Sequence, residues 1–420
     1  MVLYNILCKN GRFGYKEAFF AILPNKLSIY FALIKQFFRG EKMKRLISAF
    51  LALCLAFIMG TTAFAEGITI SAKSAILIEK NTGRVLFEYE ADTPMPPASI
   101  TKIMTLLLVM EAIENGKIAL ETEVTASEHA CSMGGSQIWL EPGEVFSVHE
   151  LLKAAAIASA NDACTALAEA VSGTEEAFVE LMNQKAAELG MSNTVFKNCT
   201  GLDAEGHVST ARDIAKMSAA LLSYDKIKEY STVWMDSLRN GETELTNTNK
   251  LVRFYKGCTG LKTGSTDEAG CCLAASAERE GMELISVTLG SPNTDERFAA
   301  GRKLLDYGFA NFAAAKPVPP QEELFDIPVL HGTADYIVPV FEEPKTFLLP
   351  KGQESQIEQK VTLPEKLEAP VEKGQVIGKV TVSLNGGEIG EYNILAKEGT
   401  EKMSFLAAIK ILFAKAVSTA

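Results

Sequence analysis

The sequence predicts an α/β (α+β) fold, in which helices pack on an antiparallel sheet, followed by a small all-β domain. Strand-like runs lie at both ends of the segment 68–312, and helical patterns lie between them. Strands arranged in this way are expected to pair in one sheet that the helices cover. After the Pro-rich stretch 316–320, short alternating runs and turn signals replace the helical patterns. The 420 residues are enough for two or three domains.

The elements of this fold follow one another in a clear order. The first two strands are predicted within 74–90, where β-rich runs flank the turn sequence Asn81-Thr82-Gly83. A helix is predicted at 100–113, after the start signal Pro96-Pro97-Ala98-Ser99. The remaining predictions are helices at 149–170, 174–189 and 208–224, a three-strand meander at 258–264, 271–278 and 283–290, a helix at 295–312, a linker at 316–320, a β domain at 321–400 and a terminal helix at 401–420.

Composition excludes several classes of function. Hydrophobic residues make up 47% of the chain and charged residues 22%, which is typical of globular proteins. The net charge of −11 argues against a nucleic-acid partner, because phosphates require a basic face. Four histidines offer little material for a His-based metal site, and neither common Gly-rich phosphate loop is present. We therefore expect no metal, no other cofactor and no nucleic-acid partner.

The N-terminal region predicts export. Residues 44–65 read KRLISAFLALCLAFIMGTTAFA: a basic pair, an apolar run and a small-x-small cleavage site. This is the layout of a secretory signal peptide. A membrane anchor is the alternative, but the apolar run is shorter than the roughly 20 residues that a span needs. Because Met43 directly precedes the basic pair, residues 1–42 are expected to be untranslated or a mis-assigned start.

Six cysteines follow the predicted cleavage site, and an exported chain can pair them. Cys258 and Cys272 flank an apparent hairpin, so a single cross-strand disulfide is one possibility. Free buried thiols are the other. The six are Cys131, Cys164, Cys199, Cys258, Cys271 and Cys272.

The terminal segment 401–420 has the pattern of an amphipathic helix. Its apolar residues recur at helical spacing and form one face: Phe405, Ile409, Leu412, Phe413 and Ala416. Three lysines make it a poor membrane span. We expect it to lie in the plane of the outer face of the cytoplasmic membrane, and the alternative is a helix docked on the β domain.

Ser99 and Lys102 are the first candidate catalytic pair. They are three residues apart at a helix start, so their side chains lie on one helix face. The electropositive helix N-terminus favours an attacking alkoxide. Apolar neighbours would lower the pKa of Lys102, so that its neutral amine takes the Ser99 proton. The same Ser-x-x-Lys spacing recurs at 223–226, and an N-cap serine with a surface lysine would give it too.

Two further motifs carry polar residues in unusual places. Ser159-Ala160-Asn161 interrupts an apolar helix; it either caps a helix break or points into a site, with Ser159 relaying a proton and Asn161 holding a substrate amide. Lys262-Thr263-Gly264 lies on a predicted strand, where Gly264 would let a peptide-like ligand approach the strand edge. The alternative is an ordinary strand end before a turn.

Together, the three motifs have the order Ser-x-x-Lys, Ser-x-Asn, Lys-Thr-Gly. In this order the chain resembles the low-molecular-mass penicillin-binding proteins, the serine-type D-Ala-D-Ala carboxypeptidases of family S11. The resemblance covers about residues 68–312, and the β domain and terminal helix follow as they do in family members. Other similar stretches are Pro97-Ala98-Ser99, Met133-Gly134-Gly135-Ser136, Gly206 to Asp213 and Gly260 to Gly270.

The resemblance implies a DD-peptidase domain at 66–315, of the fold shared with β-lactamases, and a role for each site residue. Ser99 would attack the D-Ala-D-Ala carbonyl, Lys102 would be its base and Ser159 would relay a proton. Asn161 would hold the substrate, and the backbone N–H groups of Ser99 and Ser265 would form the oxyanion hole. The residues implied to contact the substrate or its terminal carboxylate are Asn161, Lys262, Thr263, Gly264, Ser265 and Arg297.

The implied partners are peptidoglycan stem peptides ending in D-Ala-D-Ala, β-lactam antibiotics and the membrane surface. Two alternatives remain open at this point. A class A-like β-lactamase shares the motifs but needs an additional base for deacylation, and the second β domain is not typical of it. A non-catalytic cell-wall-binding scaffold would be expected to lack a catalytic residue, and none of the expected residues is missing.

Overall fold

The computed structural model of the chain describes residues 68–405 and 408–409. The predicted signal peptide, the start at Met43 and most of the amphipathic tail lie outside the described residues. Of the described tail residues, Phe405 and Ile409 are exposed. Among the helices described, none is both long and apolar enough to cross a membrane.

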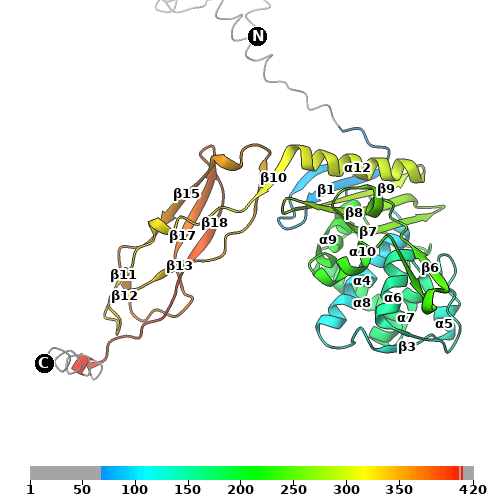
Figure 1. Cartoon of the computed structure of the whole chain (residues 1–420), viewed down its shortest axis with the longest axis horizontal. Helices are drawn as coiled ribbons and strands as arrows, with labels where there is room; N and C mark the ends of the chain where they lie inside the picture. Colours follow the sequence, from blue (N-terminus) through cyan, green and yellow to red (C-terminus); the bar gives the residue numbers. More distant parts are fainter. Residues whose placement is uncertain (1–67, 406–407, 410–420) are drawn as a thin grey trace, which may run out of the picture. The chain divides into compact units, whose positions relative to one another are not determined.

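A five-stranded antiparallel sheet forms the centre of the first domain (Figure 1). Its order is β2-β1-β9-β8-β7, so the two ends of the segment meet where β1 pairs with β9. The predicted pairing of terminal strands is therefore confirmed. The strands are β1 (Ser74–Glu79), β2 (Val85–Tyr89), β7 (Cys258–Thr266), β8 (Gly270–Arg279) and β9 (Met282–Ser291).

Helices cover both faces of this sheet. Because side chains alternate along a strand, Leu77 of β1 packs in a core cluster with α12 (Thr294–Asn311), whereas Ile76 packs in the opposite cluster. That second cluster contains α4 (Lys102–Glu114) and α9 (Ala211–Leu221), together with most of the other helices.

The remaining elements of the first domain are short, apart from two helices. The helices are α5 (Glu128–Cys131), α6 (Val148–Lys153), α7 (Asn161–Ser172), α8 (Glu175–Glu188), α10 (Lys228–Ser231) and α11 (Leu251–Phe254). The strands are β3 (Glu123–Thr125), β4 (Val145–Ser147), β5 (Met235–Leu238) and β6 (Thr243–Thr246), and the 3₁₀ turns are η1 (Ala98–Thr101), η3 (Asp225–Ile227) and η4 (Arg239–Gly241).

The helix predicted over 149–170 is interrupted at Ser159-Ala160-Asn161, so the interpretation of this motif as a helix break is confirmed. Helix α6 ends at Lys153 and is followed by one turn of π-helix, η2 (Ala154–Ala158). The helical path is interrupted after this turn. Ser159 then adopts a left-handed conformation with φ 63°, which no helix interior allows, and α7 begins at Asn161. The break places Ser159 and Asn161 at a helix junction rather than on one helix face.

The C-terminal domain is all β, as predicted. Strands β13 (Pro339–Phe341), β18 (Gly387–Ala396), β17 (Val376–Leu384) and β15 (Ile357–Thr362) form its largest sheet, in that order. Val380, Val382 and Ile394 of this sheet are buried in the domain's own hydrophobic cluster. The smaller sheets are built from β10 (Phe312–Ala315) with β14 (Phe347–Pro350), and from β12 (Tyr336–Ile337), β11 (Ile327–Leu330) and β16 (Leu367–Glu368).

The six described cysteines are all free thiols. The register of β7 on β8 explains why the possible Cys258–Cys272 disulfide does not form. Cys258 is opposite Ala277, and Cys272 is opposite Gly264. The two cysteines therefore lie far apart along the hairpin, and the alternative of free thiols is the correct one.

Candidate active site

The Ser99–Lys102 pair lies at the start of α4, as predicted. Ser99 is in the 3₁₀ turn η1, and Lys102 is the first residue of the α-helix. Lys102 Nζ lies 3.0 Å from Ser99 Oγ. The lysine is fully buried, and this burial lowers its pKa; the charges of Cys164, Cys199 and Asp162 act in the opposite direction but do not outweigh it. Burial thus favours the neutral amine that a general base requires.

Two further groups accept hydrogen bonds from Lys102 Nζ. They are Asn161 Oδ1 at 2.5 Å and the backbone carbonyl of Thr200 at 2.6 Å. Asn161 is buried at the start of α7, and its Nδ2 donates to the Gly134 carbonyl at 2.6 Å. That second bond fixes the orientation of the amide, so Oδ1 faces the lysine.

Ser159 lies two residues before Asn161 but makes no direct hydrogen bond with the Ser99–Lys102 pair. It is buried, and its left-handed backbone forms the break before α7. Within the described part of the chain, no hydrogen bond joins Ser159 to Ser99 or Lys102.

Strand β7 brings Lys262-Thr263-Gly264 against the Ser99 turn. A Cβ atom on Gly264 would lie 2.8 Å from the Ser99 amide nitrogen and 3.0 Å from Ala98 Cβ, closer than van der Waals contact permits. Glycine is therefore required for this approach. Because β7 is the last strand of its sheet, its outer edge pairs with no other strand in the described part of the chain.

Two buried basic side chains lie at this edge, and neither forms an ion pair with another described residue. Lys262 is 1% exposed, its Nζ has no hydrogen-bond partner, and burial followed by the charge of Lys102 lowers its pKa to about 7. Arg297 of α12 donates from Nη1 to the Gly264 carbonyl at 3.2 Å, whereas its Nε is unpartnered. Buried cationic groups of this kind are costly unless an anion neutralises them, so the arrangement favours binding of a carboxylate.

The turn 198–201, which the sequence analysis missed, completes the site. It supplies the Thr200 carbonyl to Lys102. A backbone carbonyl cannot be recognised from the residue types in a sequence. Gly201 has φ 84°, and a Cβ there would lie 1.9 Å from the Ala98 carbonyl oxygen. The combination Asn198-x-x-Gly201, an Asx-type turn, is the only sequence signal that points to this turn.

His207 is a second residue that the sequence analysis did not assign. Its Nδ1 accepts from the Lys197 amide at 3.3 Å, so in the neutral ring Nε2 carries the proton and donates to Thr101 Oγ1 at 2.9 Å. Burial lowers the pKa of His207 to about 4. The neutral imidazole of His207 therefore holds the Ser99–Lys102 turn through its hydrogen bond to Thr101.

The helix-start serine and lysine, the Ser-x-Asn helix junction and the Lys-Thr-Gly edge strand define a low-molecular-mass penicillin-binding protein. Comparison with known families agrees. Residues 60–293 match the D-alanyl-D-alanine carboxypeptidase family, Peptidase S11, and residues 312–402 match the penicillin-binding protein 5 C-terminal domain. The chain belongs to the D-alanyl-D-alanine carboxypeptidase family.

The match to individual relatives covers nearly the whole length of each relative. D-alanyl-D-alanine carboxypeptidase DacF of Bacillus subtilis is 41% identical over 379 residues, 88% of this chain and 97% of the relative. DacA of Escherichia coli is 33% identical, over 89% of this chain and 96% of its own.

Solved structures give the same result. Penicillin-binding protein 5 of Haemophilus influenzae is 32% identical, with a TM-score of 0.70 over 80% of this chain and 99% of that chain. Penicillin-binding protein D2 of Listeria monocytogenes, solved in an ampicillin-bound form, is 34% identical, with a TM-score of 0.53 over 58% of this chain and 99% of that chain.

Proposed function

We propose that Ser99 is the nucleophile and Lys102 the general base of a serine-type carboxypeptidase that removes the terminal D-Ala from peptidoglycan stem pentapeptides. The observation that carries this proposal is the 3.0 Å contact between Lys102 Nζ and Ser99 Oγ, with the lysine fully buried. A desolvated amine of lowered pKa accepts a hydroxyl proton near neutral pH. Membership of the carboxypeptidase family supports the substrate class.

Acylation would proceed as follows. Ser99 Oγ bonds to the carbonyl carbon of the penultimate D-Ala, and its proton passes to Lys102 Nζ. Collapse of the tetrahedral intermediate breaks the peptide C–N bond, and the departing D-Ala amine takes up a proton, for which we assign the relay to Ser159. Water then hydrolyses the ester and restores the Ser99 hydroxyl. The burial of Ser159 beside Asn161 supports this role.

The terminal carboxylate would bind Lys262, Thr263 and Arg297. The two cations are buried with unpartnered nitrogen atoms, and Thr263 adds a hydroxyl from the same strand. Charge-assisted hydrogen bonds to a carboxylate are roughly twice as strong as neutral ones. This clamp explains why a free C-terminus would be preferred, which is the property of a carboxypeptidase.

We assign the oxyanion hole to the backbone N–H groups of Ser99 and Ser265. The close approach of Gly264 to the Ser99 amide supports this assignment, because Ser265 is the next residue on β7. One oxyanion donor contributes about 2.7–4 kcal/mol to transition-state stabilisation. Asn161, which accepts a hydrogen bond from Lys102, would also hold the substrate amide.

β-Lactams would acylate the same serine, since their strained ring amide presents a carbonyl to Ser99 and their carboxylate lies where the carboxylate clamp would bind it. The experiment that tests the proposal is labelling with a fluorescent penicillin, followed by peptide mapping. Label on Ser99 supports the assignment. A long-lived label supports a peptidase, whereas rapid loss of the label would indicate a β-lactamase.

We further propose that the protein works outside the cytoplasm. The sequence of residues 44–65 supports export, and the pattern of 401–420 supports attachment to the outer face of the cytoplasmic membrane. A stem-peptide substrate, which is part of the cell wall, requires the same location.

A further inference from the structure

The direction of the Lys102 lone pair depends on two acceptors. A neutral amine has two N–H groups and one lone pair. Asn161 Oδ1 and the Thr200 carbonyl accept the two N–H groups, at 2.5 Å and 2.6 Å, and neither of these oxygens donates. The lone pair that remains is aimed at the Ser99 hydroxyl, 3.0 Å away. The Thr200 carbonyl is thus as important for aiming the base as Asn161 is.

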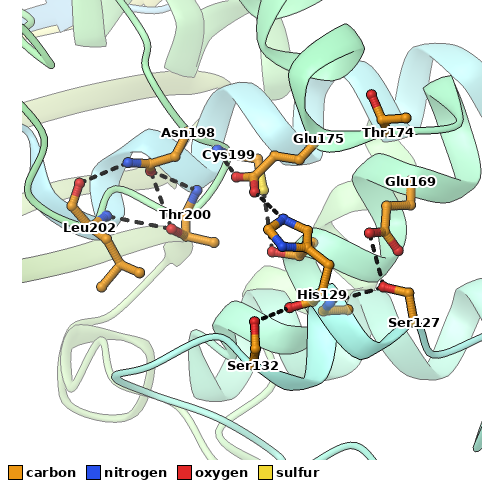
Figure 2. A network of polar contacts seen from close by, with 12 residues as sticks. Ser127, His129, Ser132, Glu169, Thr174, Glu175, Asn198, Cys199, Thr200 and Leu202 are labelled. Carbon is orange, nitrogen blue, oxygen red and sulfur yellow. Dashed lines mark hydrogen bonds and ion pairs between the residues drawn. The ribbon is translucent and has the colours of Figure 1, made fainter. Parts of the chain in front are cut away.

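The Asn198 side chain makes most of the hydrogen bonds that close the turn presenting this carbonyl, and Thr200 Oγ1 adds one by accepting from the Leu202 amide at 3.4 Å. Asn198 Oδ1 accepts from the Thr200 amide at 3.2 Å, from Thr200 Oγ1 at 3.2 Å and from the Gly201 amide at 2.6 Å. Asn198 Nδ2 donates to the Leu202 carbonyl at 2.8 Å. Figure 2 shows the bonds that join the Asn198 amide to Thr200 and to Leu202.

The residue before Thr200 is held separately. The Cys199 amide donates to Glu175 Oε1 at 3.0 Å, and the Cys199 carbonyl accepts from Thr105 Oγ1 of α4 at 2.6 Å. Glu175 also contacts His129 Nε2 at 2.7 Å (Figure 2). Glu175 and Thr105 therefore hold residue 199, whereas the peptide that carries the Thr200 carbonyl is held by Asn198 through its Gly201 N–H group.

We propose that Asn198 is a positioning residue for the general base: it holds the Thr200 carbonyl against Lys102 and so aims the lysine lone pair at Ser99. The proposal rests on the function proposed above for Ser99 and Lys102. Asn198 has no hydrogen bond to Ser99, Lys102 or Asn161 among the described residues, so it acts through the turn alone.

Removal of the side chain is expected to affect rate and pH dependence together. In Asn198→Ala the Thr200 and Gly201 N–H groups lose their acceptor, and the carbonyl is free to turn away. Acylation by penicillin is then expected to slow about 10- to 100-fold, as for other losses of catalytic alignment. Because the carbonyl also stabilises the ammonium form, its loss lowers the pKa of Lys102 and moves the acid limb of the acylation profile to lower pH.

A second variant, which changes the charge near Lys102, is expected to move the acid limb in the opposite direction. The groups that act on Lys102 are Asp162 and Cys164 of α7, Cys199 of the turn and Lys262 of β7. Asn198→Asp keeps an oxygen acceptor for the turn but adds a negative charge. It is expected to retain more activity than Asn198→Ala and to move the acid limb to higher pH.

A matched control is available in the same region. Asn183 also ties backbone together, because Oδ1 accepts from the Phe196 amide at 2.9 Å and Nδ2 donates to the Phe196 and Val179 carbonyls at 3.0 Å and 2.9 Å. None of these hydrogen bonds reaches the turn 198–201. Asn183→Ala is expected to lower the melting temperature while leaving the acid limb in place.

The measurement is the second-order rate of labelling by fluorescent penicillin from pH 4 to 9, normalised to the concentration of active sites. A wild-type rate and acid limb in Asn198→Ala would overturn the proposal. If Asn198→Ala fails to fold, an unmoved acid limb in Asn198→Asp overturns it as well. Absence of label from Ser99 in the wild-type protein would instead overturn the proposed function, so the two failures are distinguishable.

Discussion

Lys262 is buried within electrostatic reach of Lys102, and the charge of Lys102 adds to desolvation in lowering the Lys262 pKa to about 7. The proposed mechanism assigns these lysines opposite states. Lys102 has to be neutral to accept the Ser99 proton, whereas Lys262 has to be charged to bind a carboxylate. The mutual repulsion of two buried ammonium groups opposes double protonation, so a bound carboxylate at Lys262 is compatible with a neutral Lys102.

Ser99→Ala is expected to abolish D-Ala release and penicillin labelling while leaving the melting temperature close to that of the wild type. Loss of a catalytic serine costs about 10⁶-fold in rate. D-Ala release from a stem pentapeptide and gel fluorescence measure the two effects. Label that persists in the variant, or appears at Ser223, would contradict the assignment.

Lys262→Ala and Arg297→Ala are each expected to weaken turnover of substrates with a free carboxylate far more than that of their amides. A hydrogen bond to a charged group contributes about 1.5–3 kcal/mol, which corresponds to roughly 10- to 100-fold in kcat/KM. The comparison of acid and amide forms of one peptide supplies the control. Equal losses on both forms would place the two residues outside carboxylate recognition.

Carboxylate binding is expected to take up a proton above pH 7. In the free protein the pKa of Lys262 is about 7, so its charged form predominates only below that pH. A bound carboxylate favours the ammonium form and raises this pKa, hence affinity falls as pH rises through 7 and protons enter on binding. Calorimetry of Ser99→Ala with an acyl-D-Ala-D-Ala peptide, in two buffers of different ionisation enthalpy, measures the uptake. The uptake should disappear in the double variant with Lys262→Met.

Gly201→Ala is expected to disrupt the site more than an equivalent change at Gly206. Both glycines have positive φ, so each alanine carries a backbone cost of about 1–2 kcal/mol. At Gly201 the new Cβ would also lie 1.9 Å from the Ala98 carbonyl oxygen, whereas at Gly206 the nearest atom is Lys197 Cε at 3.4 Å. Melting temperatures and labelling rates compare the two. Similar labelling rates would show that the Ala98–Ser99 turn tolerates displacement.

Truncation after Glu398 is expected to release the mature protein from membranes with unchanged activity on a soluble peptide. The apolar face of 401–420 would supply the attachment, and Phe405 is exposed in keeping with that role. Fractionation of cells that express the full and truncated chains measures it. If the truncated protein still sediments with membranes, the tail is not the anchor.

Local sequence patterns predicted most of the fold. The turn at Asn81-Thr82-Gly83 and the meander from 258 to 290 were recognisable because turn residues separate β-rich runs. The helix break at Ser159-Ala160-Asn161 was one of two interpretations of that motif, but the left-handed backbone of Ser159 was not predicted, because serine has no intrinsic preference for it. The choice between a Cys258–Cys272 disulfide and free thiols stayed open in the sequence, because a hairpin's register, and not its sequence spacing, decides which residues are opposite.

The candidate site was predictable only where it uses distinctive side chains. Ser99, Lys102, Asn161 and Lys262 carry functional groups at spacings that stand out in the sequence. Thr200 contributes a main-chain carbonyl, which any residue type could supply, and Asn198 acts by folding a turn, for which the spacing to Gly201 is the one signal in the sequence. Only the three-dimensional arrangement brings the turn and the helix start together.

The close approach of Gly264 to the Ser99 amide bears on antibiotic resistance. A simple way to exclude a bulky drug is to add a side chain next to the reactive group. At Gly264 an added side chain would displace the Ser99 backbone and with it the nucleophile, so a gain in drug exclusion would be matched by a loss of activity on the natural peptide. Resistance that preserves the enzyme therefore has to arise farther from the serine, where the antibiotic and the natural peptide differ in shape.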